Sequence, residues 1–372
     1  MRSLSEEHVA VIGGGLGGLC DALCMSARGA RVTVYEAAEA FTEVGAGIQV
    51  SSNGLKVLRA LGLDPSGGVA SRGLTLNDNR GRRVAILPND ARREVRLFHR
   101  ADLLALLAKG CRERGVEIRF GARVGPEAAP EANLIIAADG VKSAFRAAVD
   151  PDLAAPKFTG QIAWRALVKV PTPVGEAGVN LYMGAGQHVV VYPLRGGKFI
   201  NVVAAEDTDE RAAEGWQVAA SRADLQARFA QFGGPVPALL AAAEHVHHWG
   251  LFAHRLPTRW SEGRVVLLGD AAHAMLPYLA QGACAAFEDA YILAREWAGS
   301  DDPDEALGRY ESLRAPRVAR VTAEAQANAR RFHHANPVAR FIGYTGMRAA
   351  SAFAPGLLAR RFDWLYQYDA TA

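Results

Sequence analysis

The residues best suited to chemistry lie in three turns, each of which follows an apolar run. Residues 13–18 follow the run at 8–12, and Asp139 follows the run at 134–138. Asp270 lies in the third turn, which follows the run at 265–268. The runs read as buried strands, and parallel strands bring their carboxyl ends to one edge of a sheet. Backbone N–H groups and carboxylates there can hold phosphates, sugar hydroxyls and a polar ring edge. The three turns together indicate a dinucleotide site.

The first turn reads Gly-Gly-Gly-Leu-Gly-Gly and opens a helical stretch. Gly13, Gly15 and Gly18 have the GxGxxG spacing, in which glycines permit a tight turn, close approach of the backbone to a pyrophosphate and close helix–strand packing. A second strand ends in Glu36, about 20 residues further on, where a carboxylate accepts hydrogen bonds from a ribose. Strand, helix, strand and terminal acid together make the motif specific.

The composition is that of an ordinary globular protein. The chain has 372 residues, of which 50% are hydrophobic and 22% charged, with a formal net charge of +3. This charge is too small and too dispersed to indicate nucleic acid. The sequence contains no run of about 18 apolar residues, so we expect no membrane span and a cytoplasmic location. The four cysteines lack the spacing of a metal site, so we predict buried thiols and no metal.

The organisation along the chain changes near residue 161, from alternating strands and helices to successive strands joined by Gly/Pro turns. We predict an α/β fold: a Rossmann-like dinucleotide-binding domain over 1–160 and 256–300, an inserted antiparallel-sheet domain over 161–255, and a C-terminal helical region over 301–372. A hairpin is expected at 72–87 and a helix capped by Asn53 at 54–60. In the C-terminal region, kinks or breaks are expected at Pro316, Pro337 and Pro355.

In their order and spacing these motifs resemble the single-component FAD-dependent aromatic hydroxylases, also called group A flavoprotein monooxygenases. Within that group the likeness is greatest to salicylate hydroxylase-like and 6-hydroxynicotinate hydroxylase-like members. The matching residues are Gly13, Gly15, Gly18, Glu36, Arg100, Asp139, Gly140, Ser143, Arg146, Gly269, Asp270, His273, Pro277, Gln281 and Gly282, with the segment from Val44 to Asn53. The resemblance covers nearly the whole chain and is more specific for the family than for the substrate.

The resemblance implies FAD in a GR2-type Rossmann-like domain. The residues expected to bind FAD are Gly13, Gly15, Leu16, Gly18, Glu36, Gly47, Arg100, Asp139, Asp270, Gln281, Gly282 and Ala283. In this family NAD(P)H reduces FAD, oxygen adds at C4a of the flavin, and the hydroperoxide hydroxylates an electron-rich arene. Pro277 and the residues after it would pass beside the flavin ring. A single fingerprint is present, so NAD(P)H is expected as a transient co-substrate without a domain of its own.

The substrate side is expected on the antiparallel sheet. His188 and Tyr192 lie four residues apart on one strand, so both face the same way. A neutral imidazole could take a phenol proton, or Tyr192 could hydrogen-bond the oxygen. Gln49 could point into the same space, where hydroxynicotinate hydroxylases place a histidine. By alternation only one of Trp164 and Arg165 faces the pocket, and an arginine there could pair with a substrate carboxylate.

The favoured function is FAD-dependent hydroxylation of a small aromatic substrate, hydroxybenzoate-like or salicylate-like, with O2 and NAD(P)H as co-substrates. The alternatives are hydroxylation of an N-heteroaromatic such as a hydroxynicotinate, and a non-catalytic FAD-fold binding protein. The intact set of Glu36, Arg100, Asp139 and Asp270 argues against the binding protein. A monomer or a homodimer is expected, and His273 is expected to serve structure near the Asp270 turn.

Overall fold

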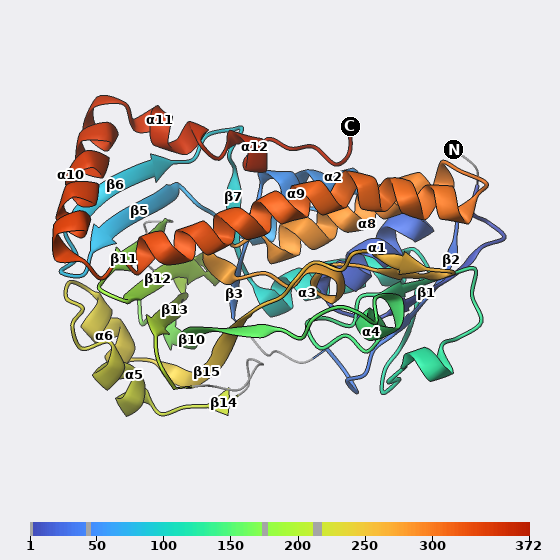
Figure 1. The fold of residues 1–372 in the computed structure, drawn as a ribbon, viewed down its shortest axis with the longest axis horizontal. Helices are drawn as coiled ribbons and strands as arrows, with labels where there is room; N and C mark the ends of the chain where they lie inside the picture. The colour runs from blue at the N-terminus through green and yellow to red at the C-terminus, as the bar shows by residue number, and fades with distance from the viewer. Residues whose placement is uncertain (1–2, 42–45, 173–177, 211–217) are drawn as a thin grey trace.

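A computed structural model describes residues 3–41, 46–172, 178–210 and 218–372. Val44 and Gly45, part of the segment that resembles the hydroxylases, lie outside the described residues. Two large sheets lie at opposite ends of the molecule, and the long helix α9 (Pro303–Phe332) runs across both (Figure 1).

The first sheet has the strand order β16-β17-β9-β1-β2-β8. Its strands are β1 (His8–Ile12), β2 (Arg31–Tyr35), β8 (Glu117–Arg119), β9 (Leu134–Ala137), β16 (Ser261–Glu262) and β17 (Val265–Leu267). All neighbours pair in parallel except β16 with β17. The central strands are apolar throughout because helices cover them, among them α1 (Leu16–Ser26), α3 (Arg100–Glu113) and α8 (Gly282–Ala298). Since β17, β9 and β1 are adjacent, the three predicted turns meet at one edge.

The second sheet has the order β14-β15-β10-β13-β12-β11-β5-β6. Its strands are β5 (Gly73–Asp78), β6 (Arg83–Pro88), β10 (Lys157–Lys169), β11 (Val179–Met183), β12 (Gln187–Leu194), β13 (Phe199–Asp207), β14 (Val218–Ala219) and β15 (Glu244–Ala253). The predicted hairpin, β5–β6, comes from the first part of the chain and joins this sheet through a parallel pairing of β5 with β11. The sheet is otherwise antiparallel.

The two faces of the second sheet have different tasks, because side chains alternate along each strand. One face carries Trp164 and packs on α5 (Arg222–Arg228) and α6 (Val236–Ala241), burying an apolar cluster that includes Phe229. The other face lines a cavity shared with the first sheet. Alternation therefore gives this sheet one core face and one face for a ligand.

A small sheet of β3 (Gly47–Ser51), β7 (Val95–His99) and β4 (Val69–Ala70) connects the two large ones. It leads into α2 (Ser52–Ala60), and here the predicted cap is wrong. The N-cap is Ser51, whereas Asn53 lies inside the helix and donates hydrogen bonds to Gln281 (3.0 Å) and Glu288 (2.7 Å). A buried carboxylate is the stronger partner for this amide.

The C-terminal region consists of α9, α10 (Pro337–Phe353), α11 (Pro355–Arg360) and α12 (Asp363–Tyr366). Pro337 and Pro355 begin α10 and α11, as expected for helix breaks. Pro316 does not end α9, which continues to Phe332 because a buried face that includes Arg314 and Val318 holds the helix in place.

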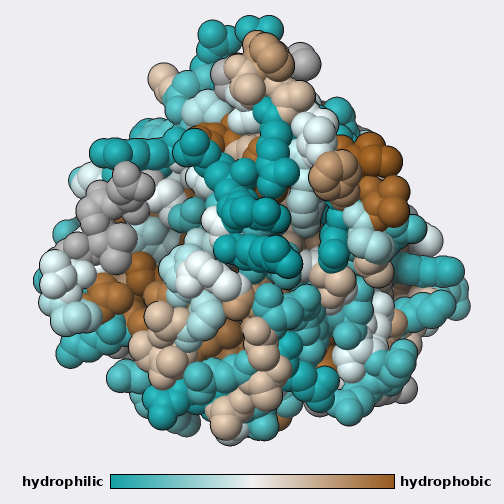
Figure 2. Space-filling view, turned by 90° about the vertical axis from the view of Figure 1, so that its left-hand side faces the viewer, coloured by the Kyte–Doolittle hydropathy of each residue, from teal (hydrophilic) through white to brown (hydrophobic). Residues whose placement is uncertain are grey.

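The end of the molecule that carries α10 is mostly hydrophilic, with small apolar clusters (Figure 2). Large apolar side chains of α10 are exposed, namely Val338, Phe341, Ile342 and Phe353. Among the described residues, no helix is long and apolar enough to cross a bilayer, and no group of three or more His, Cys, Asp or Glu side chains could hold a metal ion. All four cysteines are buried, as predicted, and free of disulfides.

Candidate active site

In the first turn, two glycines are required by close packing and a third, Gly15, borders open space. Gly13 has a φ of +106°, and a Cβ there would lie 2.4 Å from the carbonyl oxygen of Ala138. A Cβ at Gly18 would lie 2.0 Å from the carbonyl oxygen of Gly13, whereas nothing lies within 4 Å of one at Gly15. Helix α1 begins directly after Gly15, with no side-chain cap. Its first N–H groups are therefore available to a phosphate.

Glu36 is fixed to this turn by two backbone donors. Its Oε2 accepts from the N–H of Gly14 (2.7 Å) and its Oε1 from that of Ala38 (2.8 Å). Each carboxylate oxygen can accept a second hydrogen bond. The position beside α1 and the remaining lone pairs suit a ribose hydroxyl.

The second and third turns are cross-linked by an arginine. Arg146 donates to the carbonyl oxygens of Val141 (2.9 Å), Asp270 (2.6 Å) and Ala271 (2.7 Å). Asp139 accepts from the N–H of Ala144 through Oδ2 (2.9 Å), while its buried Oδ1 has no hydrogen-bond partner among the described residues. A buried acceptor without a partner is costly, so this oxygen points to a bound donor. The turns thus fit a dinucleotide such as FAD.

Asp270 begins the short helix α7 (Asp270–His273) after Gly269, whose φ is +62°. Burial lowers the pKa of Arg100, and the carboxylate of Asp270 partly offsets this. Both residues line the cavity. His273 serves structure, because its Nε2 lies 2.5 Å from the buried Asp289, which also accepts from the N–H of Gly269 (3.2 Å).

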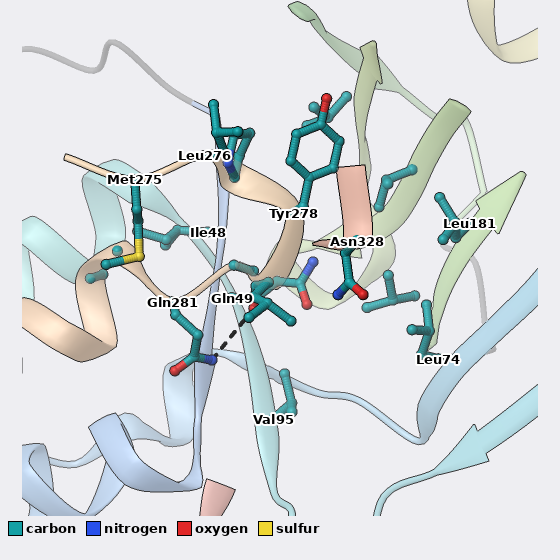
Figure 3. A pocket seen from close by; sticks show the side chains of 18 of the residues that line it. Ile48, Gln49, Leu74, Val95, Leu181, Met275, Leu276, Tyr278, Gln281 and Asn328 are labelled. Atoms are coloured by element: carbon teal, nitrogen blue, oxygen red, sulfur yellow. Dashed lines mark hydrogen bonds between the residues drawn. The ribbon is translucent and has the colours of Figure 1, made fainter. Parts of the chain in front are cut away.

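The segment after α7 brings Gln281 and the first residues of α8 to the cavity. Gln281 is buried, donating to the hydroxyl of Ser51 (2.9 Å) and accepting from Asn53. Gly282 and Ala283, at the start of α8, line the cavity. Figure 3 shows Gln281 on one side and Tyr278 rising from the same segment.

The cavity has a volume of about 600 Å³ and extends between the two large sheets. The predicted site residues that line it are Gly15, Leu16, Gly47, Gln49, Arg100, His188, Tyr192, Asp270, Pro277, Gln281, Gly282 and Ala283. Gly13, Gly18, Glu36 and Asp139 lie outside its lining, at the turns described above. Figure 3 shows Gln49, Tyr278 and Asn328 around the pocket, with Leu74 and Leu181 forming an apolar wall.

Tyr192 and Gln49 meet at the cavity wall. Burial raises the pKa of Tyr192, and the nearby Arg165 and a hydrogen bond with Gln49 act in the opposite direction. Gly47 is needed here, because a Cβ would lie 2.5 Å from the Tyr192 ring, and its N–H donates to Asn201 (2.7 Å). Arg165 lines the cavity, and its guanidinium lies 5.3 Å from the centroid of the Trp249 ring.

Sequence reasoning missed the aromatic cluster around His188. Its ring lies 5.4 Å from that of Tyr278 and 5.6 Å from that of Phe332, centroid to centroid, and its Nδ1 lies 2.7 Å from Nε2 of His333. Phe332 is the last residue of α9 and His333 is its C-cap, 145 residues from His188. The adjacent Phe-His pair at a helix end was the available signal, but its partner strand could not be inferred.

These features define a dinucleotide-binding fold with a cavity that extends along a second sheet. A family model described as "FAD binding domain" matches residues 6–129 and 125–325, and the chain belongs to this family. The predicted fold class and FAD as cofactor are thereby confirmed.

Similar proteins and solved structures agree with this family assignment. The chain is 38% identical over 358 residues to 3-amino-4-hydroxybenzoate 2-monooxygenase of Streptomyces cremeus (88% of each chain) and 32% identical over 416 residues to salicylate hydroxylase of Pseudomonas putida (98% of this chain, 92% of the relative). The structure of Klebsiella pneumoniae HpxO complexed with FAD and uric acid has a TM-score of 0.83 at 26% identity, covering 97% of both chains. The predicted class, an FAD-dependent aromatic monooxygenase, is confirmed.

Replacing Asp270 by alanine should weaken FAD binding by about tenfold to a hundredfold, because a charged hydrogen-bond partner at the cofactor cavity is lost. Arg100 also loses the carboxylate that offsets its burial. The measurement is FAD affinity of the apoprotein from flavin fluorescence. Asp209→Ala, an exposed acid outside the cavity lining, is the control. Equal affinities in both variants would contradict the role of Asp270.

Proposed function

We propose that the enzyme uses NAD(P)H and O2 to hydroxylate a small arene that carries both a phenol and a carboxylate, as hydroxybenzoates do. The single observation that carries this proposal is that His188 and Arg165 lie on the cavity face of the same sheet. A base and a cation that line the same cavity suit the two polar groups of such a substrate.

The strand register gives the spacing of these two residues. His188 pairs with Ala205 on β13, and Ala205 pairs with Ala163 on β10, two residues before Arg165. Two steps between strands and two residues along one place the Cα atoms about 12 Å apart. Both residues line the cavity, so a ligand that contacts both groups must span a distance of this order.

The electrostatics of the cavity favour an anion. Among the lining residues that the structure describes, Asp270 is the one carboxylate, whereas there are five arginines, Arg100 and Arg165 among them. The other three, Arg93, Arg331 and Arg361, form ion pairs with Asp90, Asp363 and Glu324, so the charge that favours an anion is that of Arg100 and Arg165. Burial lowers the pKa of Arg165 to about 10, which leaves it charged at neutral pH. A substrate carboxylate would compensate the cost of burying this cation.

The roles of the other side chains follow from their contacts. Burial, with His333 beside it, lowers the pKa of His188 well below its usual value, so the imidazole is neutral and can accept the phenol proton. Gln49 holds the hydroxyl of Tyr192, which can hydrogen-bond the substrate oxygen. FAD, when bound, supplies electron transfer from NAD(P)H and activation of O2. The apolar wall of Leu74 and Leu181 excludes water from the ring.

Arg165→Met tests the carboxylate contact. With 3-amino-4-hydroxybenzoate, the substrate named for several relatives, KM should rise about tenfold to a hundredfold. With 2-aminophenol, which lacks the carboxylate, KM should change little. For the carboxylated substrate, Arg165→Lys should raise KM less than Arg165→Met does. The assay is NADH and NADPH oxidation with the product identified. An equal rise in KM for both compounds would contradict the contact.

A further inference from the structure

We propose that His333 and Asp207 connect the base His188 to solvent and form a proton relay out of the cavity. The inference rests on the proposed function, in which His188 deprotonates a bound phenol. It adds two positioning residues, at the C-cap of α9 and at the end of β13, that do not touch the substrate themselves. Among the three side chains, His188 alone lines the cavity.

The three side chains form a continuous chain of short contacts. Nδ1 of His188 lies 2.7 Å from Nε2 of His333, and Nδ1 of His333 lies 2.6 Å from Oδ1 of Asp207. The exposed fractions decide the direction: His188 is 5% exposed and His333 6%, whereas the side chain of Asp207 is 48% exposed. This series of three side chains therefore begins at a buried cavity and ends in water.

The surroundings of this chain hold its members in place. Gln161 donates to Asp207 (2.8 Å) and accepts from the hydroxyl of Tyr278 (2.6 Å). The backbone of Gly186 adds two further links, because its N–H donates to the carbonyl oxygen of His333 (3.3 Å) and its carbonyl oxygen accepts from the N–H of Asp207 (2.8 Å). Tyr278 and Phe332 pack on the His188 ring.

The carboxylate of Asp207 decides which nitrogens carry protons. Nδ1 of His333 lies 2.6 Å from Oδ1 of Asp207 and 3.2 Å from the amide nitrogen of Gln161. The shorter, charged contact prevails, so Nδ1 of His333 carries a proton and Nε2 of His333 is an acceptor. His188 then donates from Nδ1, which leaves the lone pair of its Nε2 as the remaining acceptor. The exposed carboxylate thus holds the buried His188 in the tautomer that a base requires.

Proton transfer along the chain balances. The phenol O–H bond breaks and its proton joins Nε2 of His188, while Nδ1 of His188 gives a proton to Nε2 of His333. Nδ1 of His333 gives a proton to Asp207, which releases it to water. The net change is phenol to phenolate plus one solvated proton, with no oxidation or reduction, and both imidazoles are left in the opposite tautomer. Return of a proton along the same contacts, when the product oxygen is reprotonated, restores the starting tautomers. Among the described residues, the titratable groups in contact with His333 include His188 and Asp207, which belong to the relay, and Tyr278, whose ring packs on that of His333.

Rapid mixing of the oxidised, FAD-loaded protein with 3-amino-4-hydroxybenzoate tests the relay, with phenolate formation followed by its ultraviolet absorbance. In His333→Ala we expect phenolate formation to slow by at least about tenfold, with affinity for the probe within about threefold. Added imidazole should restore the rate by occupying the vacated space. His334→Ala, the exposed neighbour, is the matched control and should match the unaltered protein.

Asp207→Asn gives a second, independent readout at an exposed position. An amide can donate to Nδ1 of His333, which reverses both tautomers and turns Nε2 of His188 into a donor. We expect the same slowing as in His333→Ala, with recovery in Asp207→Glu. An unchanged rate in either variant, or slowing in His333→Ala that imidazole does not restore, would overturn the relay alone. If the unaltered protein forms no phenolate from the bound probe, the proposed role of His188 fails and the relay fails with it.

Discussion

Replacing His188 by glutamine should slow hydroxylation by about a hundredfold to ten-thousandfold while FAD stays bound, because the proposed general base is removed and the cofactor turns are untouched. Single-turnover hydroxylation of the reduced enzyme mixed with O2 and substrate measures this step. His334→Gln is the control, since that side chain is exposed and outside the cavity lining. A rate that matches the unaltered enzyme would exclude His188 as the base.

The lowered pKa of His188 predicts how the rate of hydroxylation depends on pH. Burial and His333 lower the pKa of His188 in the folded protein, so the neutral imidazole persists at pH values where an ordinary histidine is protonated. The His188-dependent rate should therefore hold as pH falls through about 6.5 and be lost only at lower pH. A rate that halves near 6.5 would contradict this account of the site.

Arg314→Met should lower the free energy of unfolding by about 3–5 kcal/mol, because two carboxylates would stay buried without their shared cation. Arg314 is fully buried, with Nη1 2.7 Å from Glu288 and Nε 2.7 Å from Asp289. Asp289 in turn holds His273 and the N–H of Gly269. Because this carboxylate positions the Gly269 turn, FAD affinity should fall together with stability.

Urea unfolding measures the effect, with Arg309→Met as the control. Arg309 makes partly exposed ion pairs with Glu296 and Glu305, which typically contribute less than about 1 kcal/mol. The folded-state pKa values of Glu288 and Asp289 lie below their ordinary values, so their contribution is present above about pH 4 and is lost as pH falls further. Equal loss in both variants would contradict a special role for Arg314.

The sequence signals for the cofactor side are local. A glycine fingerprint, the acid Glu36 and the turns at Asp139 and Asp270 each sit at the end of an apolar strand, and parallel pairing brings such ends together. The fold class and FAD followed from these short patterns. The alternation rule likewise placed His188 and Tyr192 on one face.

The substrate side depends on contacts between distant segments, which periodicity does not reveal. The parallel pairing of β5 with β11 carries the first part of the chain into the second sheet, and the 2.7 Å contact of His188 with His333 joins β12 to the end of α9. The prediction that Asn53 caps α2 was wrong for the same reason. Its partners, Gln281 and Glu288, lie more than two hundred residues away.

Oxygen incorporation tests the central claim most directly. The FAD-loaded enzyme would be supplied with NAD(P)H, isotopically labelled dioxygen and 3-amino-4-hydroxybenzoate, and the products analysed by mass spectrometry. The account predicts a hydroxylated product with one labelled oxygen atom, formed with the unaltered enzyme and greatly reduced with His188→Gln. NAD(P)H oxidation that yields hydrogen peroxide without any labelled aromatic product, across this compound, salicylate and 6-hydroxynicotinate, would contradict it.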